Sequence, residues 1–294
     1  MHSLEFLEID KTVYIPENLG ECDRRQYLDM SKLILLYQLG DINLDEFRTH
    51  GFYALMNMEY YKNPSDIAQQ EKMQSITMHS VLLDSFFIKG EDNNLHVIQD
   101  YIHNPVKTVK YKAMTFVGPK DSFDGMTYGQ MEDGLGELAN FTKTGDFECL
   151  LKLFAIFYLR PNERYSKVDI DKRIVYFKYL DVRYVYGFYL LFVSFFNYLT
   201  KQCQILVDGK EIDLTILFQT NENDSSEKIT LDYESIGLRS TTFQLAESGV
   251  FGTLQELREN DAFMALIRMY DLTIRNMKEE KELEAHKNKN SSHD

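Results

Sequence analysis

The sequence has little cysteine, and its three cysteines, Cys22, Cys149 and Cys203, include no Cys-x-x-Cys pair. An odd number of thiols without such pairing does not form the disulfide framework of a small secreted protein. Reduced thiols are typical of proteins that stay in the cytosol. We therefore expect an intracellular protein.

Positive charge is also scarce. The chain carries 32 Lys and Arg against 46 Asp and Glu, which gives a formal net charge of -14 at pH 7. Binding to DNA or RNA depends on Lys and Arg that neutralise phosphates, so the average field of this chain repels nucleic acid. We expect no nucleic-acid partner.

The sequence lacks a long apolar run and a secretion signal. Its start is acidic and has neither the basic residues nor the apolar segment of a signal peptide. The stretch Tyr184–Leu199 is uncharged, but it is shorter than the roughly 20 residues that span a bilayer, and it contains Ser194 and Asn197. It predicts a helix buried within the core or in an oligomer interface, and we expect no membrane partner.

Catalytic and metal-binding motifs are missing as well. Histidines never occur at the i, i+4 spacing of helical zinc ligands, and no Gly-rich phosphate loop or Gly-x-Ser-x-Gly elbow is present. His96 and His103 lie on a β-rich segment and could converge, although surface or core histidines are the simpler interpretation. The pair Asp169-x-Asp171 has basic neighbours and is better explained as a solvated helix start. We expect no catalytic residue, no metal and no cofactor.

The sequence does have enough apolar content to fold. Hydrophobic residues make up 44 % of the 294 positions, which can bury a substantial core. Helical periodicity dominates, and short alternating segments interrupt it. We predict an α+β fold that is predominantly α-helical, built from helical hairpin modules with small β-hairpins.

Helices are predicted wherever apolar residues recur at helical spacing between capping and stopping residues. The first expected helix begins after Asp23 and ends at Gly40, the second begins after Asn43, and the third follows Pro64. The next three are expected from Thr127 to Thr142, from Asp146 to Pro161, and from Asp171 or Arg173 to Lys201. The last carries an apolar stripe from Phe263 to Met277.

Strands are predicted where apolar and polar residues alternate. One short strand is expected within residues 1–15, and a strand pair within residues 94–118. Asp208-Gly209, between two alternating segments, indicates a tight hairpin. The polar segment 220–228 is expected to be a mobile loop.

Module boundaries follow from these changes of pattern. We predict an N-terminal helical module at 1–92, and a strand pair, second helical module and long buried helix at 93–203. A β-hairpin and an amphipathic helix follow at 204–285, and a disordered tail at 286–294.

Two parts of the chain resemble each other. Gln26 and Asp29 match Gln130 and Asp133, and a Gly-Asp stop follows in both segments, 14–58 and 116–161. Each segment reads as an extended stretch, a helix, a stop and a second helix. Two interpretations stay open: a duplicated helical hairpin, or two ordinary hairpins that look alike.

The same region carries a family resemblance. Residues Asn104–Pro161, with a Gly-Pro turn before the Thr-x-Gly-Gln helix start at Thr127, resemble helical proteins of tailed phages and prophages of Bacteroidetes-type hosts. Residues Phe243–Glu282 resemble the C-terminal segment of tail-assembly chaperones from the same setting. The resemblance covers about half of the chain, which is longer than such chaperones usually are, and 162–230 has no counterpart in it.

The resemblance implies a non-enzymatic, protein-binding role in phage tail assembly. The implied partners are other phage tail or neck proteins, with the tape-measure protein as a candidate, and self-association into a homo-oligomer is also open. The implied location is the host cytoplasm during assembly. One alternative is a permanent virion component in the neck or tail, and a second is an unrecognised intracellular enzyme.

A protein-binding surface is predicted near the C-terminus. Phe251 lies between glycines, where a large exposed ring is costly, and charged residues crowd in after Met277. The apolar positions Ile274 and Met277 therefore have less of their own fold to pack on. We expect Phe251, Ile274 and Met277 to contact a partner.

Overall fold

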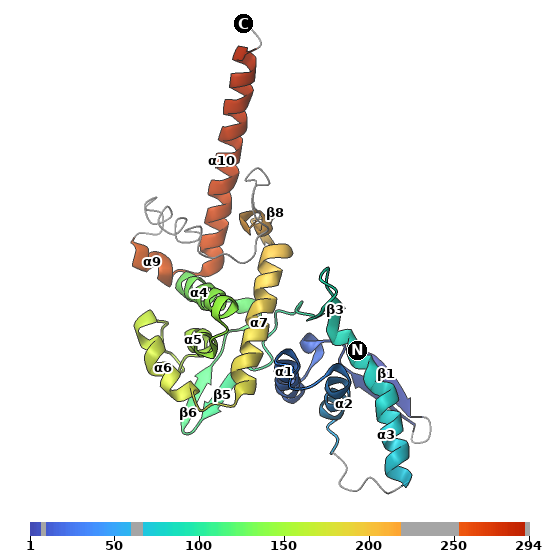
Figure 1. The fold of residues 1–294 in the computed structure, drawn as a ribbon. Helices are drawn as coiled ribbons and strands as arrows, with labels where there is room; N and C mark the ends of the chain where they lie inside the picture. The colour runs from blue at the N-terminus through green and yellow to red at the C-terminus, as the bar shows by residue number, and fades with distance from the viewer. Residues whose placement is uncertain (7–9, 60–66, 219–252, 292–294) are drawn as a thin grey trace. The chain divides into compact units, whose positions relative to one another are not determined.

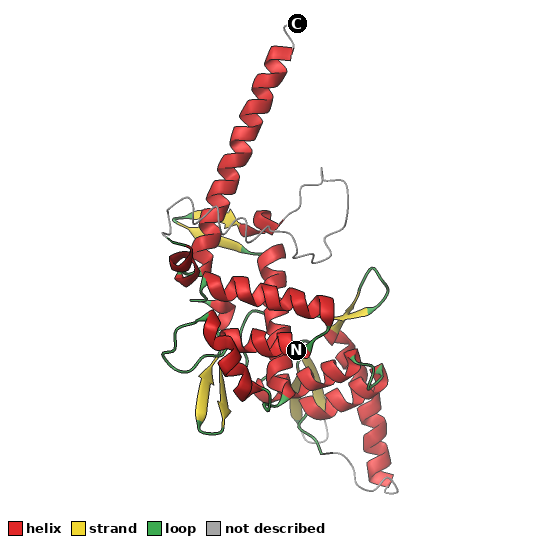
Figure 2. Cartoon of the chain, turned by 60° about the vertical axis from the view of Figure 1, so that its left-hand side comes forward, coloured by secondary structure: helices red, strands yellow, loops and turns green. Residues whose placement is uncertain are grey.

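The computed structural model describes residues 1–6, 10–59, 67–218 and 253–291, and these form a predominantly helical fold (Figure 1). The strands of the described residues pair as separate two-stranded antiparallel hairpins (Figure 2). This confirms the predicted α+β class. No helix among the described residues is long and apolar enough to cross a membrane.

The chain divides into two compact units that each join distant segments. Unit 1 comprises Met1–Ser122 and Lys172–Phe195, and unit 2 comprises Phe123–Asp171 and Phe196–Asp294. The sequence modules predicted at 1–92, 93–203 and 204–285 remain a prediction.

Unit 1 begins with a β-hairpin and a helical hairpin. Its elements are β1 (His2–Phe6), β2 (Lys11–Ile15), α1 (Arg24–Gln38), α2 (Leu44–Leu55), α3 (Ile67–Ser80), β3 (Phe87–Lys89), β4 (Leu95–Val97), β5 (Thr108–Tyr111) and β6 (Met114–Val117). Helices α6 (Ile170–Phe177) and α7 (Val182–Lys201) follow, and the division between the units falls inside each of them. Short 3₁₀ turns occupy Leu19–Glu21, Val81–Phe86, Asp121–Phe123, Lys167–Asp169 and Leu214–Phe218.

The helix boundaries of α1 and α2 follow the predicted capping residues. Asp23 and Gln26 form a capping box at the start of α1, and Asn43 and Glu46 form another at the start of α2. Gly40 has a φ of 76°, the left-handed conformation that ends a helix. Both predicted helices are confirmed.

A buried polar network joins α1 to α7 inside unit 1. The hydroxyl of Tyr27 donates to the carbonyl of Gly187 at 2.7 Å and lies 2.8 Å from the hydroxyl of Tyr101. Gly187 allows this approach, because a Cβ there would lie 3.0 Å from both Tyr27 and Ser31. The apolar run predicted at 184–199 is thus a helix with a largely buried surface.

The prediction of one continuous helix from Asp171 or Arg173 to Lys201 is wrong. The chain leaves the helical path after Phe177, and α7 starts at Val182. Asp181 begins the second helix, since its carboxylate accepts from the backbone N–H of Arg183 at 3.0 Å. An aspartate that caps a helix stabilises this break.

The strands also differ from the prediction. Residues 94–118 do not form one strand pair, because β4 pairs with the preceding β3 and β5 pairs with β6. Tight turns explain the local pairing: Asn93 and Lys112 have φ values of 62° and 53°. Within residues 1–15, the described segments His2–Phe6 and Lys11–Ile15 pair as two antiparallel strands, where one strand was predicted.

Unit 2 contains the second helical hairpin. Its elements are α4 (Tyr128–Thr144), α5 (Phe147–Phe157), β7 (Gln204–Val207), β8 (Lys210–Asp213), α9 (Leu254–Glu259) and α10 (Ala262–Ser291). The hairpin predicted at Asp208-Gly209 is confirmed, with positive φ at both residues. The segment predicted as a mobile loop, 220–228, lies outside the described residues.

Helix α10 is buried only along its first half. Ala262, Ala265, Leu266 and Met269 are buried, while residues 275–279 are exposed. The helix continues to Ser291, into the segment 286–294 predicted as a disordered tail. Glu, Lys and Ala are strong helix formers, which favours the continuation of the helix.

Candidate functional site

An open groove lies on the α1–α2 hairpin of unit 1. Its volume is about 580 Å³. The lining residues come from α1, α2, the connection between them, the residues after α2 and the start of α7: Arg25, Asp29, Lys32, Leu33, Leu36, Ile42, His50, Tyr53, Ala54, Asn57, Met58 and Arg183. We call this site the α1–α2 groove.

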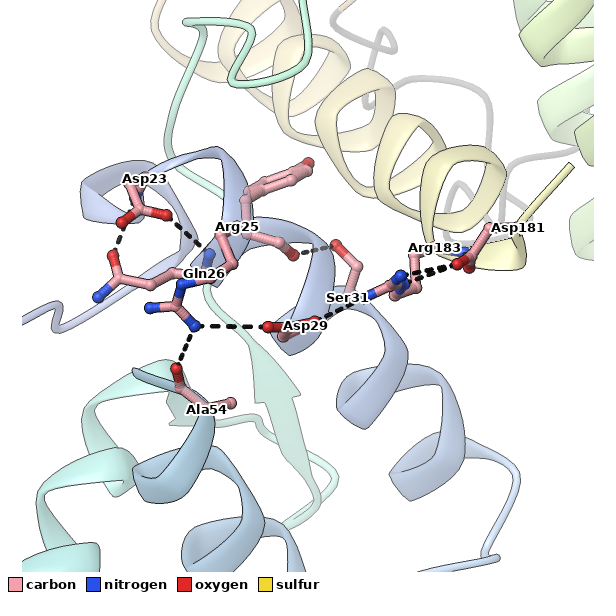
Figure 3. A network of polar contacts seen from close by, with 9 residues as sticks. Asp23, Arg25, Gln26, Asp29, Ser31, Ala54, Asp181 and Arg183 are labelled. Atoms are coloured by element: carbon pink, nitrogen blue, oxygen red, sulfur yellow. Dashed lines mark hydrogen bonds and ion pairs between the residues drawn. The ribbon is translucent and has the colours of Figure 1, made fainter. Parts of the chain in front are cut away.

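The start of α1 holds the end of α2 and so fixes one end of the groove (Figure 3). Gln26 caps its own helix and donates from Nε2 to the carbonyl of Leu55 at 2.9 Å. Arg25 donates from Nη1 to the carbonyl of Ala54 at 2.6 Å. The last carbonyls of a helix have no i+4 N–H partner within it, and these two side chains donate to the carbonyls at the end of α2. The carbonyl of Ala54 also accepts from the backbone N–H of Asn57 at 3.2 Å.

The polar part of the groove lining includes one carboxylate and two arginines, Asp29, Arg25 and Arg183 (Figure 3). Asp29 accepts from Arg183 at 2.6 Å and lies 3.4 Å from Nη1 of Arg25. Arg183 also binds Asp181, and this hydrogen bond holds the pKa of the Asp181 carboxyl below its usual range. The arginines are therefore oriented by carboxylates and carbonyls before any ligand arrives.

The groove is more positive than the chain as a whole. Arg25, Lys32 and Arg183 line it, and Asp29 is the lining carboxylate. Lys32 is exposed at the rim. The remaining wall includes Leu33, Leu36, Ile42 and Met58. Cations beside apolar side chains suit an anionic group carried on an apolar surface.

The cysteines Cys22, Cys149 and Cys203 lie outside the lining of the α1–α2 groove. A nucleophilic cysteine needs a lowered pKa, whereas burial raises the pKa of Cys22, Cys149 and Cys203. Within the described ranges, no group of three His, Cys, Asp or Glu side chains is arranged to hold a metal ion. His96 lies 2.9 Å from Asp92 on an exposed turn.

The α4–α5 hairpin of unit 2 repeats the geometry of α1–α2. Thr127 and Gln130 form the capping box of α4, and Gln130 donates from Nε2 to the carbonyl of Ile156, near the end of α5, at 3.0 Å. Asp133 occupies the place of Asp29, three residues after the glutamine. The glutamine of the repeated Gln-x-x-Asp thus has the same structural role in both hairpins.

Asp133 is more deeply buried than Asp29. Its side chain is 7 % exposed, against 29 % for Asp29. It accepts from the hydroxyl of Tyr165 at 2.5 Å and from the ammonium of Lys167 at 2.7 Å, and it also pairs with Arg258 of α9. The second hairpin therefore has its carboxylate covered by segments of the same chain.

The predicted binding residues near the C-terminus remain a prediction. Phe251 lies outside the described residues. Ile274 is half-buried, and Met277 is 41 % exposed on the part of α10 beyond its buried stripe. The structure does not place Ile274 or Met277 in the α1–α2 groove.

Sequence reasoning missed the groove itself. Arg25 and Lys32 lie about two turns apart on α1, but Arg183 comes from α7, and no spacing rule joins residues so far apart in the chain. The sequence Asp-Arg-Arg-Gln at 23–26 does indicate the capping box that starts α1, and Arg25 of this stretch lines the groove.

Comparisons with protein-family models, with curated proteins and with solved structures find no match to this chain.

Proposed function

We propose that this chain is a non-enzymatic protein-binding protein of phage particle assembly, acting as a chaperone for a tail protein in the host cytoplasm. The phage setting rests on the resemblance of Asn104–Pro161 and Phe243–Glu282 to phage proteins. The observation that carries the binding role is the open α1–α2 groove, where fixed cations lie beside apolar side chains.

The groove supports a protein partner better than a small substrate. It lies open along a helical hairpin, and its arginines are already engaged by Asp29, Asp181 and the carbonyl of Ala54. Such preorganised charges provide specificity and a fast encounter with an oppositely charged surface. An extended or helical segment of a second protein can satisfy both the charged and the apolar parts.

Co-expression with the tape-measure protein tests the role. The chaperone should keep the tape-measure protein in the soluble fraction, and the two should elute together in size-exclusion chromatography. A tape-measure protein that is equally soluble with and without this chain, and that elutes separately, would overturn the proposal.

Mass spectrometry of purified virions separates two forms of the role. A chaperone is absent from mature particles or present only in trace amounts. A constant copy number in every particle would instead assign a permanent place in the neck or tail.

A further inference from the structure

The two helical hairpins differ in what covers the same face of their first helix. Matching Gln26 with Gln130 places Gly129 at the position of Arg25, Asp133 at Asp29 and Gly136 at Lys32. In unit 1 these three positions line the open α1–α2 groove. In unit 2 the start of this face is covered by the chain's own α9.

Helix α9 docks on α4 through three kinds of contact. The backbone N–H of Tyr128 donates to the carbonyl of Asn260 at 2.8 Å. Leu257 is fully buried. Arg258 pairs with Glu132 and with Asp133. A backbone approach at Gly129 completes the fit, since a Cβ there would lie 3.0 Å from the carbonyl of Arg258.

On the first hairpin Asp29 matches Asp133 and is paired with Arg183, and the groove lining as a whole is cationic. In unit 2 the hairpin supplies carboxylates, Glu132 and Asp133, and the docked helix supplies the cation Arg258. In unit 1 the position of Glu132 is Leu28, which is buried, and the groove supplies cations. An α9-like segment on the first hairpin must therefore bring carboxylates.

We propose that the α1–α2 groove binds an amphipathic helix of a partner protein whose polar edge carries Asp or Glu and whose apolar edge faces Leu33 and Leu36. The occupant covers the face of α1 that matches the face of α4 covered by α9, and its carboxylates meet the cations of the groove. Arg25 stands at the position that matches Gly129, so the close backbone approach that α9 makes on α4 is not repeated on α1. Lys32, exposed at the rim, contacts a carboxylate of the partner.

Synthetic helical peptides test the proposal on the intact chain. The probe is a fluorescein-labelled peptide of Ala, Leu and Glu, about 18 residues long so that it forms a helix by itself, with Leu and Glu on opposite edges. A second peptide carries Lys in place of Glu. We expect the Glu peptide to bind measurably in fluorescence anisotropy and the Lys peptide to bind about tenfold more weakly or not at all.

Charge reversal in the groove decides the assignment. Lys32→Glu should lower the affinity for the Glu peptide about tenfold and raise the affinity for the Lys peptide. Like charges then face each other in the complex with the Glu peptide, and opposite charges in the complex with the Lys peptide. Lys89→Glu is the matched control, since Lys89 is exposed on β3, outside the groove lining, and makes the same change of net charge. Circular dichroism of each variant verifies the fold.

The outcomes divide clearly. Loss of Glu-peptide binding in Lys32→Glu with retention in Lys89→Glu supports the groove. Equal binding of both peptides, or equal weakening by both substitutions, overturns it. If the wild-type chain dimerises in light scattering and Lys32→Glu abolishes the dimer, the occupant is a second copy and the partner assignment is wrong.

This inference rests on the proposed function, but the two fail separately. Without peptide binding the groove assignment is lost, whatever the tape-measure protein does in co-expression. With peptide binding but no co-expression effect, the groove stands and the phage partner does not.

Discussion

At the scale of single residues, two aspartates in matching places have different surroundings. Asp133 is nearly buried and contacts Tyr165, Lys167 and Arg258. Asp29 is partly exposed and is held by Arg183 and Arg25. A buried ion pair that loses one partner leaves an uncompensated charge, whereas a solvated pair loses little.

Neutralising each aspartate should therefore have unequal effects. Asp133→Asn should lower the free energy of unfolding by about 2–3 kcal/mol, because a buried carboxylate that accepts from Tyr165, Lys167 and Arg258 is lost. Asp29→Asn should lower it by about 1 kcal/mol or less. Urea denaturation of the two variants measures the difference, and equal losses would contradict the assigned burial.

Glu137 of α4 is a carboxyl in an unfavourable place. Burial raises its pKa, and among the described residues no hydrogen-bond donor reaches its buried Oε2. A carboxyl whose pKa is raised by folding binds its proton more tightly in the folded state. Stability is then lost as the pH rises above the pKa of the unfolded chain, because the folded state must hold a partly buried charge.

Removing this charge should stabilise the protein at neutral pH. We expect Glu137→Gln to raise the melting temperature at pH 7 and to have little effect near pH 4, where the glutamate is protonated in the folded state. Glu5→Gln, at an exposed site on β1, serves as the control and should change little. A stabilisation by Glu137→Gln that is equal at both pH values would rule out the charge as its cause.

At the scale of elements, one glutamine in each helical hairpin, α1–α2 and α4–α5, makes two structural hydrogen bonds. Gln26 and Gln130 accept a hydrogen bond that caps the first helix, and they donate one that holds the end of the second. Glutamate can perform the first task but cannot donate. A Gln→Glu change therefore isolates the bond between the helices.

Gln130→Glu should cost about 2 kcal/mol, because Gln130 is 8 % exposed and a carboxylate would face the carbonyl of Ile156. Gln26→Glu should cost about 1 kcal/mol, because Gln26 is half-buried. Glu46→Gln is the control. It replaces the Glu of the α2 capping box by Gln, which accepts the same capping hydrogen bond, so it should be nearly neutral. Thermal unfolding compares the three, and a neutral Gln130→Glu would show that the bond between the helices adds nothing.

Helix α7 provides much of the aromatic core of unit 1. Phe192 is 1 % exposed, so Phe192→Ala should lower the free energy of unfolding by about 3–5 kcal/mol. The matched control is Tyr179→Ala, because Tyr179 is 79 % exposed. Chemical denaturation should show a large loss for the first and a loss under about 0.5 kcal/mol for the second. Similar losses for both would contradict the burial of α7.

Elements that depend on local chemistry could be predicted from the sequence. Asp23, Asn43 and Thr127 begin helices, and Asp208-Gly209 makes a turn, through contacts within a few residues. The break before α7 could not be predicted, because the apolar periodicity is compatible with a continuous helix and the aspartate cap stands among other charged residues. Strand pairing was also missed, since alternation identifies strands but not their partners.

At the scale of the whole molecule, the groove depends on contacts between distant segments. Arg183 meets Asp29 only once α7 packs on α1, and neither residue has a local signal that predicts the other. The repeated Gln-x-x-Asp indicated two similar hairpins. It did not indicate that one face is covered by α9 while the matching face lines a groove.

The central claim is that the α1–α2 groove binds a partner protein of phage assembly. Hydrogen–deuterium exchange of the chain, with and without the co-expressed tape-measure protein, tests it most directly. The account predicts slower exchange over residues 24–57 in the complex, with α4 and α5 unchanged. A stable complex that leaves exchange over residues 24–57 unchanged would contradict it.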